Sequence, residues 1–251
     1  MEDLDLSQES QAALLQYFSS YNTYSEFSSE LSHFNEESEK PDLETKAYAT
    51  ETFWEDRYKT DSNTFEWLSN YEEISNILDE WLMNFKKSSR LLVTGCGTSE
   101  LTQKLSVIGN WSDIVSMDCS PSVIEAMKKK YPSQGVTWDV NDLTHMTYRD
   151  GEFSIIIDKA TIDALLAADK NSEESEKDDE NINHTQNVVK MMKELSRVLQ
   201  RGGVLIWLSF GENKTNFIQE NPWGKNWCLE KSQEIGEAGC MQYTAYLIRK
   251  K

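Results

Sequence analysis

Short apolar runs alternate with stretches of helical periodicity through most of the chain. Five of the runs have the length of buried strands: RLLVTGCG (90–97), DIVSMDCS (113–120), GVTWDVND (135–142), FSIIID (153–158) and VLIWLSF (204–210). Helices are predicted between them, at 99–108, from Pro121 onward and at about 185–200, with Gly202 and Gly203 as the stop of the last one. This alternation is typical of an α/β fold with a doubly wound, mostly parallel sheet.

The two ends of the pattern differ from the centre. Residues 227–235 and 241–250, WCLEKSQEI and MQYTAYLIRK, predict a C-terminal antiparallel hairpin, which brings the sheet to seven strands. Residues 47–85 predict N-terminal helices, because apolar residues recur there at helical intervals. Residues 1–45 are polar and predict a flexible tail with a short helix at 8–20. We therefore divide the chain into a tail, 1–45, and one domain, 46–251.

The acidic residues gather in two polar segments. The net charge is −18, and residues 1–45 hold eleven acids and one base, while residues 168–186 hold seven acids and two lysines. The second segment is interpreted as an acidic insertion in the domain. The remaining chain is close to neutral, and clustered Lys and Arg of the kind that bind a phosphate backbone are missing. We expect no direct nucleic-acid contact, whereas an acidic surface suits a basic partner.

Several classes of protein are disfavoured by what the sequence lacks. It has no apolar run of about 18 residues, which a membrane-spanning helix requires, and its acidic start resembles neither a secretory signal nor a transit peptide. The four cysteines are scattered and the three histidines show no metal-ligand spacing, so no metal site is predicted. We expect reduced thiols and a cytoplasmic protein.

Polar residues or glycines follow four successive predicted strands. In a doubly wound sheet, ligands bind beyond the carboxyl ends of the strands. The four tips carry Gly95-Cys96-Gly97, then Asp118, then Asn141-Asp142-Leu143, then Asp158-Lys159. Each has a plainer interpretation: turn glycines, a helix cap, a polar loop and a strand end. Glycines also permit close approach of a ligand, and a carboxylate 21 residues after Gly97 can accept both hydroxyls of a ribose.

Longer motifs sharpen this picture. The segments FWEDRY, FEWLSNY, LLVTGCGTSEL, SMDCSPSVIEAM and IIIDKATIDALL resemble those of the class I, seven-strand S-adenosylmethionine-dependent methyltransferases, which have a Rossmann-like sheet. Within that class they look like the eukaryotic lysine methyltransferases that modify translation elongation factor 1A, the elongation factor 1A lysine methyltransferase 4 and methyltransferase-like 13 subgroup. The resemblance spans about residues 47–250, and IIIDKATIDALL is its most specific match.

The resemblance implies roles for residues around an S-adenosylmethionine cofactor. From the N-terminal helices, Trp54, Tyr58 and Trp67 would close over it. At the strand tips, the implied cofactor-binding residues are Gly95, Gly97, Asp118, Cys119, Asp142, Leu143 and Lys159. The glycines would pass under the methionine portion, Asp118 would hold the ribose with Cys119 alongside, and Asp142 and Leu143 would frame the adenine. Asp158 and Lys159 would lie near the methionine end, where the substrate enters.

A lysine nucleophile must lose its proton before it can accept a methyl group, since free lysine has a pKa of about 10.4. Asp158 is the leading candidate for a catalytic carboxylate that orients the amine, and Asp163 is the second. Two departures from the family pattern stand out: Thr98 replaces the usual Asn, and Ala160 replaces the usual Gly. If position 160 requires a positive φ, Ala would be strained there.

Three functions remain open at this stage. The first is a protein lysine N-methyltransferase acting on elongation factor 1A, which the subgroup motifs favour. The second is a methyltransferase acting on another protein or on a small molecule, because a fold can host many activities. The third is a non-catalytic module that retains the cofactor, against which intact Asp118, Asp142 and Lys159 argue.

Overall fold

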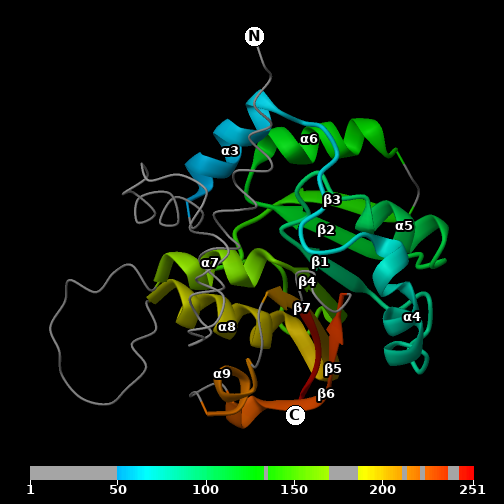
Figure 1. Cartoon of the computed structure of the whole chain (residues 1–251), viewed down its shortest axis with the longest axis vertical. Helices are drawn as coiled ribbons and strands as arrows, with labels where there is room; N and C mark the ends of the chain where they lie inside the picture. The colour runs from blue at the N-terminus through cyan, green and yellow to red at the C-terminus, as the bar shows by residue number, and fades with distance from the viewer. Residues whose placement is uncertain (1–49, 133–134, 170–185, 211–213, 221–223, 237–242) are drawn as a thin grey trace, which may run out of the picture.

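The computed structural model describes residues 50–132, 135–169, 186–210, 214–220, 224–236 and 243–251. The predicted tail, 1–45, and most of the predicted acidic insertion, 168–186, lie outside these residues, so the domain division stays a prediction. A seven-stranded sheet in the order β3-β2-β1-β4-β5-β7-β6 forms the centre (Figure 1). The strands are β1 (Leu91–Thr94), β2 (Ile114–Asp118), β3 (Val136–Val140), β4 (Phe153–Lys159), β5 (Leu199–Phe210), β6 (Trp227–Ile235) and β7 (Tyr243–Lys250).

The first five strands pair in parallel, and β7 is antiparallel to both of its neighbours. β1 pairs in parallel with β2 on one side and with β4 on the other, and β4 continues the parallel sheet to β5. β7 is inserted antiparallel between β5 and β6. The predicted sheet and its C-terminal hairpin are therefore confirmed. Because the chain reverses its winding direction next to β1, the carboxyl ends of β1, β2 and β4 form a switch point at one edge.

Helices cover both faces of this sheet (Figure 1). They are α3 (Glu51–Thr60), α4 (Tyr71–Trp81), α5 (Leu101–Val107), α6 (Pro121–Lys130), α7 (Thr161–Asp169), α8 (Gln186–Val198) and α9 (Thr215–Glu220). One core joins α4, α5 and α6 to the face that carries Leu91 and Val93, and a second joins α7, α8 and α9 to the face that carries Leu92. Successive residues of a strand point to opposite faces, so an apolar run such as β1 serves both cores.

Local sequence determines where the helices around the switch point begin. Asn70 and Glu73 form a capping box at the start of α4, in which each side chain accepts a bond from the other's backbone N–H. Ser120 caps α6, and Pro121 occupies the first turn of that helix. These signals fix α6 directly behind Asp118, at the tip of β2.

Two predicted helices end elsewhere than expected. The stretch 47–85 is not continuous, because α3 stops at Asp61 and the residues up to the Asn70 cap form a loop, which we call the 61–70 loop. The helix predicted at about 185–200 ends at Val198, before the glycines that were predicted to stop it. There the fully buried Leu199 pairs with Phe153, so the backbone enters β5 before the glycines.

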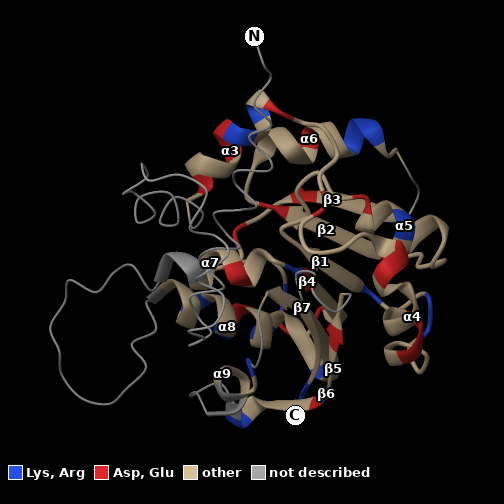
Figure 2. Ribbon diagram, in the orientation of Figure 1, with Lys and Arg blue, Asp and Glu red and all other residues tan. Residues whose placement is uncertain are grey.

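Charged residues of both signs are interspersed over the described elements, with one short basic stretch at the end of α6 (Figure 2). Within the same residues, none of the helices has the length and apolarity needed to cross a membrane.

The connection between β4 and α7 is a single residue in the left-handed conformation. Ala160 has φ +69°, a region in which an L-residue with a Cβ is disfavoured by about 1–2 kcal/mol. This is the position at which the family has Gly. The strain expected from the sequence is therefore confirmed, and it lies between Lys159 and Thr161, two residues that line the cavity described below.

We predict that Ala160→Gly raises the free energy of unfolding by about 1 kcal/mol, because Gly relieves the left-handed strain. Chemical denaturation measures this change. Ala126→Gly is the matched control, since Ala126 lies in the right-handed interior of α6 and the same substitution there should cost about 1 kcal/mol. A loss of stability in both the Ala160→Gly and the Ala126→Gly variant would contradict the backbone strain inferred at Ala160.

Candidate functional site

A cavity of about 550 Å³ lies at the switch point. Its floor consists of the tips of β1, β2 and β4 and the residues that follow β3, and its walls come from α3, the 61–70 loop and the start of α7. All ten residues predicted from the sequence to bind a cofactor line this cavity. Four elements far apart in the sequence are thus brought together around one space, although these contacts alone do not test cofactor binding.

The glycine turn after β1 has no room for side chains. Gly95 and Gly97 have φ +51° and +49°. A Cβ on Gly95 would lie 2.0 Å from Thr161 Oγ1, and one on Gly97 would lie 2.6 Å from the hydroxyl oxygen of Tyr58. The turn therefore needs glycine both for its backbone and for its neighbours, and it leaves bare backbone facing the cavity, as close approach of a nucleoside-type ligand requires.

Asp118 supports this turn from the tip of β2. Its carboxylate accepts the Gly97 N–H at 2.9 Å through Oδ2 and the Ser120 N–H at 3.0 Å through Oδ1. The side chain is buried, and burial raises its pKa above the ordinary value, while the two backbone bonds oppose that shift. Each carboxylate oxygen keeps a lone pair for a further donor. These two acceptor oxygens fit the paired hydroxyls of a ribose.

The residues after β3 supply a mixed polar and apolar wall. Leu143 is buried and lines the cavity, as a residue packed on a purine ring would. Asp142 is exposed at its rim, and its carboxylate accepts bonds from the backbone and the hydroxyl of Thr144. At the tip of β2, Cys119 also lines the cavity, and burial raises the pKa of its thiol. The thiol is therefore protonated at neutral pH.

The aromatic residues predicted to close the site do surround it. Trp54 and Tyr58 of α3 stack with ring centroids 5.9 Å apart, and Trp54 meets Trp67 edge-on at 6.3 Å. The Arg57 guanidinium lies over the rings of Phe65 and Trp67, at 5.7 and 5.8 Å from their centroids. The packed rings give the cavity a wall that excludes water on the side of α3 and the 61–70 loop.

Glu55, which sequence reasoning missed, attaches α3 to the start of α6. Its carboxylate accepts the hydroxyls of Ser120 and Ser122 at 2.5 and 2.6 Å, together with the Ser122 N–H. These bonds at the start of α6 lower the pKa of Glu55 to about 2. The signal in the sequence was only an acid on the polar side of α3, which cannot reveal a partner 65 residues away.

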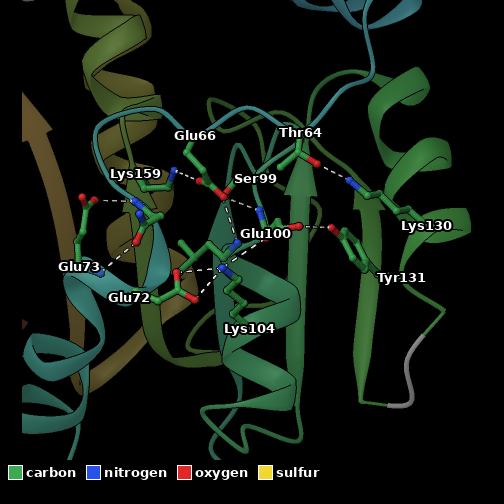
Figure 3. A network of polar contacts seen from close by, with 12 residues as sticks. Thr64, Glu66, Glu72, Glu73, Ser99, Glu100, Lys104, Lys130, Tyr131 and Lys159 are labelled. Atoms are coloured by element: carbon green, nitrogen blue, oxygen red, sulfur yellow. Dashed lines mark hydrogen bonds and ion pairs between the residues drawn. The ribbon is translucent and has the colours of Figure 1, made fainter.

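Lys159 lines the cavity with its ammonium group already engaged. Nζ donates to Glu66 Oε2 at 2.7 Å and to the Trp67 carbonyl at 2.9 Å. Burial lowers the pKa of Lys159, and the nearby Glu66 carboxylate acts in the opposite direction. Glu66 also accepts the Ser99 hydroxyl at 2.6 Å and the Glu100 N–H at 2.7 Å (Figure 3). The role of Glu66 was also missed, although FEW was among the matching motifs.

Asp158 does not face the cavity. It is fully buried and accepts the Thr94 hydroxyl at 2.5 Å and the Ile162 N–H at 3.0 Å, so that it holds β1 and the start of α7 together. The catalytic role predicted for Asp158 does not fit this geometry, because Thr94 and Lys159 line the cavity and Asp158 does not. The second candidate, Asp163, is equally buried and accepts the Ser209 hydroxyl and the Phe210 N–H.

Thr98, which replaces the usual Asn, accepts the Phe65 N–H at 3.1 Å and so helps to hold the 61–70 loop. Within the described ranges, no group of three or more His, Cys, Asp or Glu side chains could hold a metal ion.

The mostly parallel sheet, the glycine turn and the buried acid at the second strand tip together define a Rossmann-like protein with a nucleoside-binding edge. The family model described as "Methyltransferase domain" matches residues 85–245. The chain belongs to this family, and the predicted class, an S-adenosylmethionine-dependent methyltransferase, is confirmed.

Named relatives and a solved structure are similar to the chain. The bovine "eEF1A lysine and N-terminal methyltransferase" is 32% identical over 171 residues, which are 67% of this chain and 22% of that protein. The mouse "EEF1A lysine methyltransferase 4" is 31% identical over 175 residues, which are 66% and 64% of the two chains. The chain thus spans about a fifth of the first relative and less than two thirds of the second. The N-methyltransferase NodS from Bradyrhizobium japonicum shares the fold, with a TM-score of 0.58 at 14% identity over 78% of this chain and 98% of that one.

We predict that Asp118→Ala lowers the affinity for S-adenosylhomocysteine at least 100-fold, because two charge-assisted hydrogen bonds to ribose hydroxyls would be lost together. Calorimetric titration measures the dissociation constant. Asp113→Ala is the control, since Asp113 pairs with Arg90 just before β2, at the opposite end of that strand. An unchanged constant in the Asp118 variant would remove the ribose assignment.

We also predict that stability decreases from about pH 4 to pH 7. Burial raises the pKa of Asp158 to about 7 and that of Asp163 to about 6, whereas both titrate near 3.9 in the unfolded chain. The folded protein therefore binds more protons in this range, and the free energy of unfolding decreases with rising pH by up to about 1.4 kcal/mol per pH unit for each group.

Asp158→Asn should make this decrease shallower, because the amide imitates the protonated acid and cannot titrate. Denaturation midpoints between pH 5 and pH 8 measure the slope, and Asp113→Asn, on the surface, should leave it unchanged. A slope in the Asp158 variant equal to that of the unaltered protein would show that the buried acid does not titrate in this range.

Proposed function

We propose that the chain is a protein lysine N-methyltransferase that acts on translation elongation factor 1A. The observation that carries this proposal is the match, over two thirds of the chain, to relatives that are named as lysine methyltransferases of that factor. The family model, over residues 85–245, includes the glycine turn and the strand tips that line the cavity. The same fold is found in the [4+2]-cyclase SpnF, with a TM-score of 0.52 at 12% identity, so the sheet alone does not select the reaction.

The charge of the cavity supports a cationic substrate. Its lining holds four carboxylates, Glu51, Asp61, Asp118 and Asp142, and two cations, Arg57 and Lys159. Three of the acids lie at its exposed rim. A lysine ammonium approaching this mouth is attracted before it is desolvated, and an acidic rim raises its local concentration.

The proposed chemistry needs alignment more than a dedicated base. S-Adenosylmethionine, when bound, supplies an activated methyl group, and the protein contributes orientation and exclusion of water. The rings of Trp54 and Trp67 would desolvate a lysine side chain, and desolvation lowers the pKa of an amine. Asp158 and Asp163 do not reach the cavity, so we propose that the substrate proton leaves to solvent through the acidic rim.

Two further expectations accompany this function. The described ends of α7 and α8 flank the predicted acidic insertion, 168–186, and Asn187 of α8 lines the cavity. We propose that the insertion contacts a basic surface of the protein substrate, and that the enzyme is cytoplasmic like the translation apparatus it would modify. Imaging of a tagged chain and deletion of residues 170–185 test these two points.

We predict that the purified chain transfers tritium from labelled S-adenosylmethionine to purified elongation factor 1A, and that peptide mass spectrometry finds the added methyl groups on a lysine side chain. Asp118→Ala should abolish the label, whereas Asp113→Ala should retain it. Label on another protein of a lysate or on a small molecule would support a different methyltransferase. Cofactor binding without any transfer would support a non-catalytic module.

A further inference from the structure

Glu66 is the point at which three parts of the cavity wall are joined. It lies in the 61–70 loop, between Phe65 and Trp67, and it is itself only partly exposed. Its two oxygens accept bonds from the Ser99 hydroxyl and the Glu100 N–H, which follow the glycine turn, and from the Lys159 ammonium at the tip of β4 (Figure 3). One carboxylate thus links the loop, the glycine turn and β4.

Lys159 is placed by these contacts beside the glycine turn. The parallel register pairs Thr94 with Asp158, so Lys159, the last residue of β4, lies at the level of Gly95, the first residue after β1. The ammonium has three N–H donors. One goes to Glu66 and one to the Trp67 carbonyl, while the side chain lines the cavity at 6% exposure. A third donor therefore remains at the cavity wall.

A structural tie alone would not require charge at this place. Removing two charges from water is costly, and apolar residues of similar volume often replace a buried ion pair without loss of stability. A pair in which one member lines a ligand cavity gives that cavity a cation of fixed position. Of the two Lys or Arg side chains in the described lining, Lys159 is the one with an ammonium at the tip of a sheet strand.

We propose that Glu66 is a positioning residue, which holds the Lys159 ammonium so that its third N–H binds the carboxylate of the methionine portion of S-adenosylmethionine or S-adenosylhomocysteine. The proposal rests on the proposed function, because it assigns a role within the same cofactor site. It also gives a purpose to Glu66, the acid of the FEW motif, to which the sequence analysis assigned no role.

The test compares two ligands that differ at the methionine end. S-Adenosylhomocysteine carries the amino-acid carboxylate, and methylthioadenosine has the same adenosine and sulfur without it. In calorimetric titrations, Glu66→Gln should weaken the binding of S-adenosylhomocysteine about 10- to 100-fold, the effect of losing one charge-assisted hydrogen bond. The affinity for methylthioadenosine should change less than about threefold.

Glu72→Gln is the matched control, because Glu72 pairs with Lys104 on the exposed side of the same network (Figure 3). It should alter neither affinity. The Glu66→Gln variant could fail to fold because the buried Lys159 ammonium loses its charged partner. In that case the double variant Glu66→Gln with Lys159→Met removes both charges. That double variant should show the same selective loss as Lys159→Met alone, because Glu66 acts through Lys159.

The outcomes separate this proposal from the proposed function. Equal weakening of both ligands by Glu66→Gln would overturn it, since Glu66 would then only hold the loop, and unchanged affinity for both would overturn it as well. If the unaltered chain binds neither ligand, the cofactor site itself fails and both proposals fall.

Discussion

The arrangement of this protein depends on one constraint, the parallel pairing of β1 between β2 and β4. β1 has only four residues, and all of them are buried. Because parallel strands end at the same edge, the register brings Gly95, Asp118 and Lys159 to one level, although they come from segments far apart in the chain. Everything on that edge, including the helices that start from it, takes its position from these three strands.

Buried carboxylates stabilise the edge in different ways. Asp118 holds the glycine turn and remains open to the cavity, whereas Asp158 holds Thr94 and α7 from behind it. Glu66 and Glu55 act from outside the sheet, on β4 and on α6 respectively. These four acids therefore tie together the elements around the ligand space, and their hydrogen bonds leave those elements little freedom.

The sequence was informative where short-range chemistry decides the structure. The positions of the strands, the Ser120-Pro121 start of α6 and the polar strand tips could all be predicted, since each depends on neighbours along the chain. The 61–70 loop within the predicted helical stretch 47–85 was missed, because the repeat of apolar residues does not show that α3 ends at Thr60 and that a new helix starts after the capping box at Asn70. The end of α8 was misplaced because Leu199 is recruited into β5 by Phe153, a partner distant in the sequence.

The residues of the site could likewise be predicted only in part. The identities of the lining residues followed from motifs, while the direction of each side chain did not. Asp158 and Lys159 are adjacent in a strand and therefore point to opposite faces, so only one of them can meet a ligand. Sequence alone leaves open which one does, and it cannot pair Glu66 with Lys159 across 93 positions.

The attachment of α3 to α6 through Glu55 has a practical consequence. The family model begins at residue 85, yet Tyr58, Trp54 and Trp67, which close the cavity, all precede that boundary. The region that the family model matches is therefore shorter than the part of the chain that builds the cavity. A shortened gene product that starts at residue 85 would keep every strand of the sheet but lose the aromatic wall of the cavity, so an expressed protein should start before residue 50.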